Sequence, residues 1–121
     1  PCTGLGALRR RPEARWRKQP SDLPGLTELQ GELLEAGIRA AKPGGVIAYV
    51  TCSPHLAETT GVVADALRTG QVEALDTRSV LQEIAAQPMD LAAPLAGGGH
   101  AQLWPHRHGT DAMFIALLRR V

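Results

Sequence analysis

The sequence contains few aromatic residues and no long apolar run. Trp, Tyr and Phe make up 3% of its 121 residues, too few for a surface of several rings on which nucleic-acid bases could stack. No run of about 18 apolar residues occurs, and the first residues lack the basic-then-apolar order of a signal peptide. We therefore expect a cytoplasmic protein that has no membrane partner and an aliphatic core.

Cysteine is scarce as well. Cys2 and Cys52 are the only two, which excludes a disulfide scaffold and favours free thiols in a reducing compartment. Each lies beside a proline or one residue from it, in "PC" and "TCSP". Three roles stay open at this point: a small buried hydrophobe, a reactive thiol, or a Cys2–Cys52 disulfide.

Charge is distributed unevenly along the chain. Residues 1–20 carry six Arg or Lys against one Glu, whereas residues 21–121 carry seven against eleven acidic residues, although the formal net charge is only +1. The basic stretch begins close to Cys2. It can be a solvated surface loop or a binding surface for a polyanion.

The spacing of apolar residues predicts alternating helices and strands. A stripe from Leu26 to Ala41, ended by "PGG", predicts an amphipathic helix. The run Val46–Val50 predicts a strand covered on both faces, and the spacing from Leu56 to Leu67 predicts a second helix. Residues 1–25 are rich in Gly, Pro and Arg and are expected to form a loop with one helical turn.

The second half continues the pattern more weakly. Val72–Thr77 alternates like a strand, residues 79–86 suit a short helix, and Pro88–Gly99 is a predicted loop. Ala112–Leu118 is the last predicted strand. This order is typical of an α/β layered sheet, in which ligands lie at the carboxyl ends of the parallel strands, where Cys52 falls.

Histidines and glycines offer two further patterns. His100, His106 and His108 cluster near the end, but no cysteine pair stands at ligand spacing, so we predict no metal site. We expect "PHRHGTD" to be a loop near the RNA or the active site. The glycines of "PGGV" and "AGGGH" do not open a helix directly after a strand. They predict turns rather than a cradle for a cofactor.

Three ordered segments resemble one known family. They are "PCTGLGALRRRPEARWR", "LQGELLEAGIRAAKPGGVIAYVTCSPHLAET" and "LWPHRHGTDAMFIALLRR". Together they resemble the Fmu/Sun (RsmB) family of the Nol/Nop/Sun RNA cytosine-5 methyltransferases. In "GTDAMF", Ala112 and Met113 stand where the family usually has glycine and an aromatic residue, a difference that concerns local packing.

The resemblance implies a fold and a boundary. Residues 1–121 would form the C-terminal half of the catalytic domain of a Rossmann-like, S-adenosylmethionine-dependent methyltransferase. They would supply strands five to seven of a seven-stranded sheet, with the seventh strand antiparallel between the other two.

The resemblance also implies a reaction. The family transfers a methyl group from S-adenosylmethionine to carbon 5 of cytosine in RNA, and 16S ribosomal RNA is the expected substrate here. Cys52 matches the nucleophile of the family and Cys2 the cysteine that helps to release the product. Thiolate addition at carbon 6 makes carbon 5 nucleophilic, and the adduct must afterwards lose the carbon 5 proton.

The basic stretch gains a role from this resemblance. The target base must leave its stack, which costs a few kcal/mol that contacts with the flanking RNA have to offset. Basic side chains near Cys2, with one tryptophan among them, are suited to such contacts. The predicted RNA-binding residues are Arg9, Arg10, Arg11, Trp16 and Arg17.

Two elements that the family needs for its cofactor lie outside the sequence. These are the glycine-rich loop after the first strand and the acidic residue that binds the ribose, so no residue of this chain is assigned to the cofactor. The alternative function is therefore a non-catalytic RNA-binding or interaction module. A three-stranded remnant would also expose an apolar edge, which favours association with itself or with the missing half of the domain.

Overall fold

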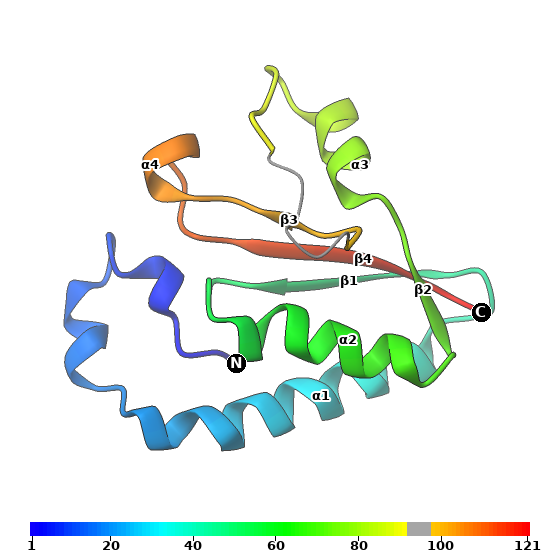
Figure 1. Ribbon diagram of the computed structural model, residues 1–121, viewed down its shortest axis with the longest axis horizontal. Coiled ribbons are helices and arrows are strands. Elements are labelled where there is room, and N and C mark those ends of the chain that lie inside the picture. The colour runs from blue at the N-terminus through cyan, green and yellow to red at the C-terminus, as the bar shows by residue number, and fades with distance from the viewer. Residues whose placement is uncertain (92–97) are drawn as a thin grey trace.

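The centre of the computed structural model, which describes residues 1–91 and 98–121, is an antiparallel sheet. Its order is β1-β4-β2, and a short additional strand, β3, also pairs with β4. Figure 1 shows β4 running through the middle of the sheet. The strands are β1 (Val46–Thr51), β2 (Val72–Ala74), β3 (Ala101–Gln102) and β4 (Phe114–Arg120).

The central strand β4 determines the direction of its neighbours. It is antiparallel to both β1 and β2, with Val50 opposite Ile115 and Val72 opposite Arg120. Consequently β1 and β2 run in the same direction on either side of it. The predicted order, with the last strand inserted antiparallel between the two before it, is confirmed.

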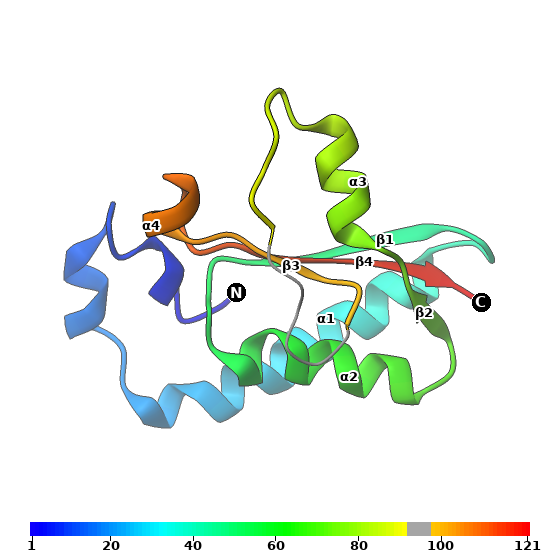
Figure 2. The same ribbon diagram turned by 45° about the horizontal axis from the view of Figure 1, so that its top comes forward.

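The two longer helices cover one face of this sheet. α1 (Leu23–Ala40) and α2 (Thr60–Arg68) lie side by side below the strands, while α3 (Thr77–Ile84) stands on the opposite face (Figures 1 and 2). α1 has a proline in its first turn and is followed by a turn at Gly44, whose φ of 77° suits glycine. The core lies between this helix pair and the sheet. Its buried members are Leu34, Ile38, Tyr49, Val62, Val63, Val72, Phe114, Ala116 and Leu118.

Two predicted burial patterns are wrong for the described residues. Leu29 and Leu33 belong to the predicted apolar stripe of α1, yet 40% and 50% of their surface is exposed. Val46 and Val50 of β1 are 58% and 49% exposed, although this strand was expected to be covered on both faces. Successive side chains of a strand point to opposite faces, and exposed and more buried residues alternate along β1, so this strand is covered on one face only.

Several local predictions also change. The opening segment forms three 3₁₀ helices rather than one helical turn, at Leu5–Ala7, Pro12–Trp16 and Pro20–Asp22. Residues expected to form a loop include the short helix α4 (Pro105–His108), which starts with a proline. The strand β3 was not predicted. Of the predicted loop Pro88–Gly99, residues 92–97 lie outside the described part of the chain.

In residues 1–91 and 98–121, no helix combines the length and the apolar character that crossing a membrane requires.

Candidate active site

The two cysteines meet at one end of the sheet. Cys52 directly follows β1, and the opening segment returns to it through Gly6, whose N–H donates to the carbonyl of Cys52 at 2.8 Å. The carbonyl of Gly6 in turn accepts the N–H of Ala112, just before β4, at 2.8 Å. As a result, the Sγ atoms of Cys2 and Cys52 lie 3.3 Å apart.

Glycine is required at position 6 because two backbones pass close to it. A Cβ atom there would lie 2.1 Å from the carbonyl oxygen of Ala112 and 2.7 Å from that of Cys52. Both neighbours are backbone atoms of residues next to β1 and β4, so they cannot rotate away as a side chain would. Gly6 therefore lets the segment that carries Cys2 dock against the ends of β1 and β4.

A buried carboxylate lies behind the cysteines. Glu58, in a 3₁₀ helix at Leu56–Glu58, is 0% exposed. Its Oε1 accepts the N–H of Thr3 at 2.7 Å and Nε2 of Gln30 at 3.1 Å; its Oε2 accepts the hydroxyls of Thr3 and Ser53, both at 2.6 Å. Burial opposes the ionisation of Glu58, but these donors outweigh it and hold its pKa below the usual range.

The environment of Cys52 does not favour the ionised form of its thiol. Burial raises the pKa of the Cys52 thiol, and the neighbouring Cys2 thiol raises it further. The next α-helix begins only at Thr60, so no α-helix N-terminus directly follows Cys52. His55 is exposed, and its Nδ1 accepts the N–H of Ala57 rather than contacting the thiol. Cys52 is therefore a partly buried thiol rather than a thiolate stabilised by a helix N-terminus.

An acidic residue next to β4 holds part of the basic segment. Asp111 is buried and pairs with Arg9 (Nε to Oδ1, 3.0 Å) and Arg10 (Nε to Oδ2, 2.9 Å). The hydrogen bond from Arg10 is the main reason that the pKa of Asp111 falls to about 2, and Arg9 contributes. These pairs fix the segment after Cys2 to the loop before β4, beside α4 in Figure 2.

The predicted RNA-binding residues all lie at the surface. Arg9 and Arg10 are exposed beyond their contacts with Asp111, and Arg11 and Arg17 are exposed too. Trp16 is 77% exposed, with the guanidinium of Arg15 stacked over its ring at 5.3 Å. Their role in binding RNA stays a prediction.

Two alternative roles for the cysteines do not match the described state. Both thiols are free, and their separation of 3.3 Å exceeds the about 2.05 Å of a disulfide bond. Both are also partly exposed rather than fully buried. Both thiols are therefore free and accessible enough to react with a substrate.

The three histidines at the end of the chain have separate partners. The ring of His100 lies 4.9 Å from that of Phe114, and the ring of His106 lies 5.9 Å from that of Trp104. His108 accepts the N–H of Trp104 through Nδ1. Within residues 1–91 and 98–121, no group of three or more His, Cys, Asp or Glu could hold a metal ion.

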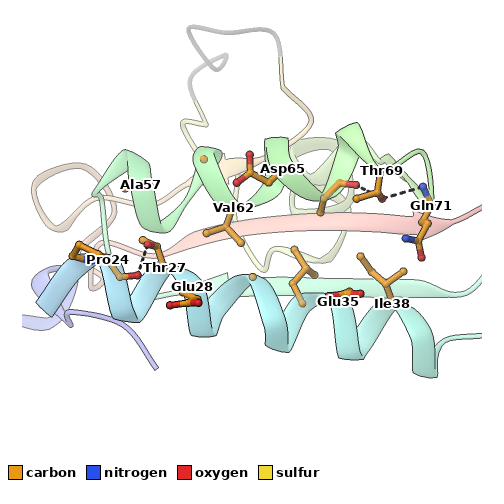
Figure 3. Close-up of a pocket in the computed structure, with 14 residues that line it drawn as sticks. Pro24, Thr27, Glu28, Glu35, Ile38, Ala57, Val62, Asp65, Thr69 and Gln71 are labelled. Carbon is orange, nitrogen blue, oxygen red and sulfur yellow. Dashed lines mark hydrogen bonds between the residues drawn. The ribbon is translucent and has the colours of Figure 1, made fainter.

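A second concave feature lies away from the thiols. A groove of about 610 Å³ runs between α1 and α2 (Figure 3). Leu34 and Val62 line its floor, and the acidic side chains of Glu28, Glu35 and Asp65 also border it. Neither cysteine lines this groove, so it is distinct from the candidate active site.

Three residues of the site were not predicted. Glu58 is the only acidic residue between Cys52 and α2, which is the one sequence signal that could have indicated it. Asp111 lies in the quoted segment "GTDAMF" without a predicted role. Gln30 is polar at a buried position of α1, 2% exposed, and its Nε2 donates to the carbonyl of Pro1 at 2.9 Å.

Comparison with known proteins gives this geometry a family context. A family model described as 16S rRNA methyltransferase RsmB/F matches residues 1–119. The chain is 63% identical over 121 residues to the putative methyltransferase Rv1407 of Mycobacterium tuberculosis, covering 100% of this chain and 25% of that protein. It is 33% identical over 125 residues to the probable ribosomal RNA small subunit methyltransferase B of Synechocystis sp., covering 99% of this chain and 26% of that protein.

A solved structure is similar along the whole chain. The crystal structure of NSun6 from Pyrococcus horikoshii with SFG, an S-adenosylmethionine analogue, is 25% identical with a TM-score of 0.78, covering 100% of this chain and 28% of that one. The chain thus spans about a quarter of the length of the curated relatives that it matches.

Proposed function

The chain belongs to the RsmB/F family of 16S rRNA methyltransferases, and from this premise we propose that the full protein methylates carbon 5 of a cytosine in RNA. Its fold is part of the Rossmann-like fold of S-adenosylmethionine-dependent methyltransferases. 16S ribosomal RNA is the proposed substrate and the cytoplasm the proposed place of action. The observation that carries the proposal is the contact between Cys2 and Cys52 at 3.3 Å.

Cys52 is the proposed nucleophile. Its thiolate adds to carbon 6 of the cytosine, forming a C–S bond and moving electron density to carbon 5, which becomes nucleophilic. S-adenosylmethionine supplies the methyl group that carbon 5 receives. Because the Cys52 thiol follows β1 and is partly exposed, it is accessible to a base that has left its stack.

Cys2 is the proposed release group. After methylation, carbon 5 still carries its proton, and the C–S bond to Cys52 must break. Cys2, ionised to the thiolate, can accept that proton; the electrons of the C–H bond then restore the double bond and expel Cys52 as thiolate. The short distance between the two sulfur atoms suits this transfer, because a base must reach the proton that it removes.

The residues described here do not fit the cofactor. Gly44 and Gly45 join α1 to β1, whereas a glycine-rich turn that cradles a nucleotide leads from a strand into a helix. We therefore assign no residue of this chain to S-adenosylmethionine and expect other residues of the full protein to hold it.

RNA would approach across the opening segment. Arg11, Arg17 and Trp16 are exposed, and guanidinium groups and an indole ring can contact phosphates and an unstacked base. Arg9 and Arg10 form ion pairs with Asp111, so they would present their remaining N–H donors to RNA in a fixed direction.

A second candidate function follows from the poor fit to the cofactor. By itself, the 121-residue chain would bind RNA without methylating it. Titration of the chain with radiolabelled S-adenosylmethionine and, separately, with a 16S RNA fragment distinguishes the two functions: saturable cofactor binding would contradict this second candidate.

The main proposal is tested on the full-length protein. We expect incubation with tritiated S-adenosylmethionine and 16S RNA to yield labelled 5-methylcytidine after nuclease digestion, and Cys52→Ser to yield none. Label in another nucleoside would reject the assignment to carbon 5 of cytosine. Glu35→Gln is the control. It should retain full activity, because Glu35 is an exposed residue of α1 whose partner is Arg39 rather than either cysteine.

A further inference from the structure

Glu58 connects the two segments that carry the cysteines. One residue after Cys2, Thr3 donates both its N–H and its hydroxyl to the carboxylate; one residue after Cys52, Ser53 donates its hydroxyl. The carboxylate is therefore the shared partner of two segments that are about fifty positions apart in the sequence.

Further contacts hold the same carboxylate in place. Gln30 of α1 donates one amide group to Oε1 of Glu58 and to the carbonyl of Pro1, which precedes Cys2. The hydroxyl of Tyr49, on β1, donates to the main-chain carbonyl of Glu58 at 2.7 Å. Cys2 is thus held on both sides, and Glu58 is fixed to the strand that leads to Cys52.

The geometry argues against a direct part for Glu58 in proton transfer. A carboxylate has about four lone-pair sites, and four donors already occupy those of Glu58. The side chain is also 0% exposed, so a substrate proton cannot reach it. Its contribution must act through other groups.

We propose that Glu58 is a positioning residue that holds the thiols of Cys2 and Cys52 within reach of each other. The consequence for catalysis rests on the proposed function. Without the hydrogen bonds of Glu58, the adduct on Cys52 would still form, but Cys2 would no longer be placed to release it. The geometric part of the proposal can be tested without RNA or cofactor.

Dibromobimane, which joins two thiols that lie close together, measures that geometry. In the full-length protein, the yield of the Cys2–Cys52 cross-link is divided by the total alkylation of the two cysteines, both by peptide mass spectrometry. We expect Glu58→Ala to lower this ratio about tenfold, because it removes four hydrogen bonds to a charged acceptor.

The conservative variant Glu58→Gln should restore part of the loss. Its amide oxygen can still accept from the N–H of Thr3 and from Gln30, while its amide nitrogen can donate to the hydroxyls of Thr3 and Ser53, which accept as well as donate. A ratio between those of the wild type and of Glu58→Ala is expected. A Gln variant as low as the Ala variant would contradict the assigned contacts.

A control matched for stability separates positioning from general destabilisation. Val72→Ala removes buried volume, because Val72 is 4% exposed, at the opposite end of β4 from Cys52. It should lower the melting temperature without changing the cross-link ratio. If it lowers the ratio as much as Glu58→Ala does, Glu58 merely stabilises the fold and the proposal is wrong.

A second variant and a measurement with RNA keep the proposal testable if Glu58→Ala does not fold or if the proposed reaction does not occur. If Glu58→Ala does not fold, Ser53→Ala serves instead: it removes one of the four donors to Glu58 and should lower the cross-link ratio by less than tenfold. An unchanged ratio in Ser53→Ala would reject the positioning role of Glu58. With RNA, Glu58→Ala should slow decay of the covalent adduct about tenfold and its formation much less. If the wild type forms no adduct, the proposed function fails, while the cross-link result still decides the role of Glu58.

Discussion

The Sγ atoms of Cys2 and Cys52 lie 3.3 Å apart as free thiols. The contact depends on a chain of backbone hydrogen bonds from Cys52 through Gly6 to Ala112 and on the buried carboxylate of Glu58. Neither cysteine belongs to a strand. Cys52 directly follows β1, and the segment that carries Cys2 is held beside it by the hydrogen bonds of Gly6 and Glu58. The spacing of the thiols is therefore a property of the docked opening segment.

Substitution of each cysteine should give a different defect. Cys52→Ala removes the proposed nucleophile, so we expect no methylation and no covalent adduct with RNA. Cys2→Ala leaves the proposed nucleophile but removes the proposed release group, so turnover should fall to background while a protein–RNA adduct accumulates. A denaturing gel with labelled RNA detects the adduct as a slow band. Normal turnover of Cys2→Ala without an adduct would overturn the assignment of roles.

The reactivity of Cys52 should rise with pH over an alkaline range. Only the thiolate is nucleophilic, and burial raises the pKa of Cys52 above its ordinary value. The thiolate fraction near neutral pH is thus below that of a free cysteine, and the rate should grow about tenfold per pH unit until the pKa is passed. Alkylation of Cys52 with iodoacetamide, followed by peptide mass spectrometry, measures this; the denatured protein is the control. A plateau below about pH 8 would contradict the raised pKa.

The order of the sheet could be predicted, because it depends on local patterns and a family resemblance. The structure contains the expected helix α1, the expected strand β1 before Cys52 and the expected last strand, β4. As predicted, β4 lies between β1 and β2. The placement of Cys52 directly after a strand followed from the apolar run that ends at Val50.

The interior of the site could not be predicted, because it consists of long-range polar contacts. Glu58 is one acidic residue among many in the sequence, and its importance appears only when Thr3 and Ser53 are brought to it. Asp111 likewise gains its role from residues about a hundred positions away. Leu29 also misled, because an apolar residue on a helix indicates a face that can be buried but not what covers it.

Gly6→Ala should destabilise the fold and separate the thiols. The new methyl group would meet the carbonyl oxygen of Ala112 at 2.1 Å, so the backbone must move, at a cost of about 1–3 kcal/mol. Urea unfolding measures the cost, and the dibromobimane cross-link should fall with it. Gly31→Ala is the matched control: its methyl group has nothing within 4 Å and lies inside α1, so a gain of about 0.5–1 kcal/mol is expected. Equal stabilities of the two variants would refute the close approach at Gly6.

Asp111→Asn should weaken the fold near neutral pH and make no difference in strong acid. The folded-state pKa of Asp111 is about 2, below the unfolded value of about 3.9. Its pairing therefore contributes stability above about pH 3.9, and that contribution is lost as the pH falls through about 2. The difference in melting temperature between wild type and variant should shrink over this range. A difference that is independent of pH would mean that Arg9 and Arg10 do not pair with an ionised Asp111.

The free edge of β1 should make the 121-residue chain self-associate. β1 pairs with β4 on one side, and no strand pairs with its other edge within residues 1–91 and 98–121. Beside that edge Val50 and Leu33 are 49% and 50% exposed and line a shared hollow. An unpaired, apolar edge favours pairing with a second copy.

Light scattering should show a mass that rises with concentration, and Val50→Lys should keep the chain monomeric, since a charge there opposes burial. Val121→Lys, at the 70% exposed last residue, is the control and should associate like the wild type. A monomer at all concentrations would reject the pairing.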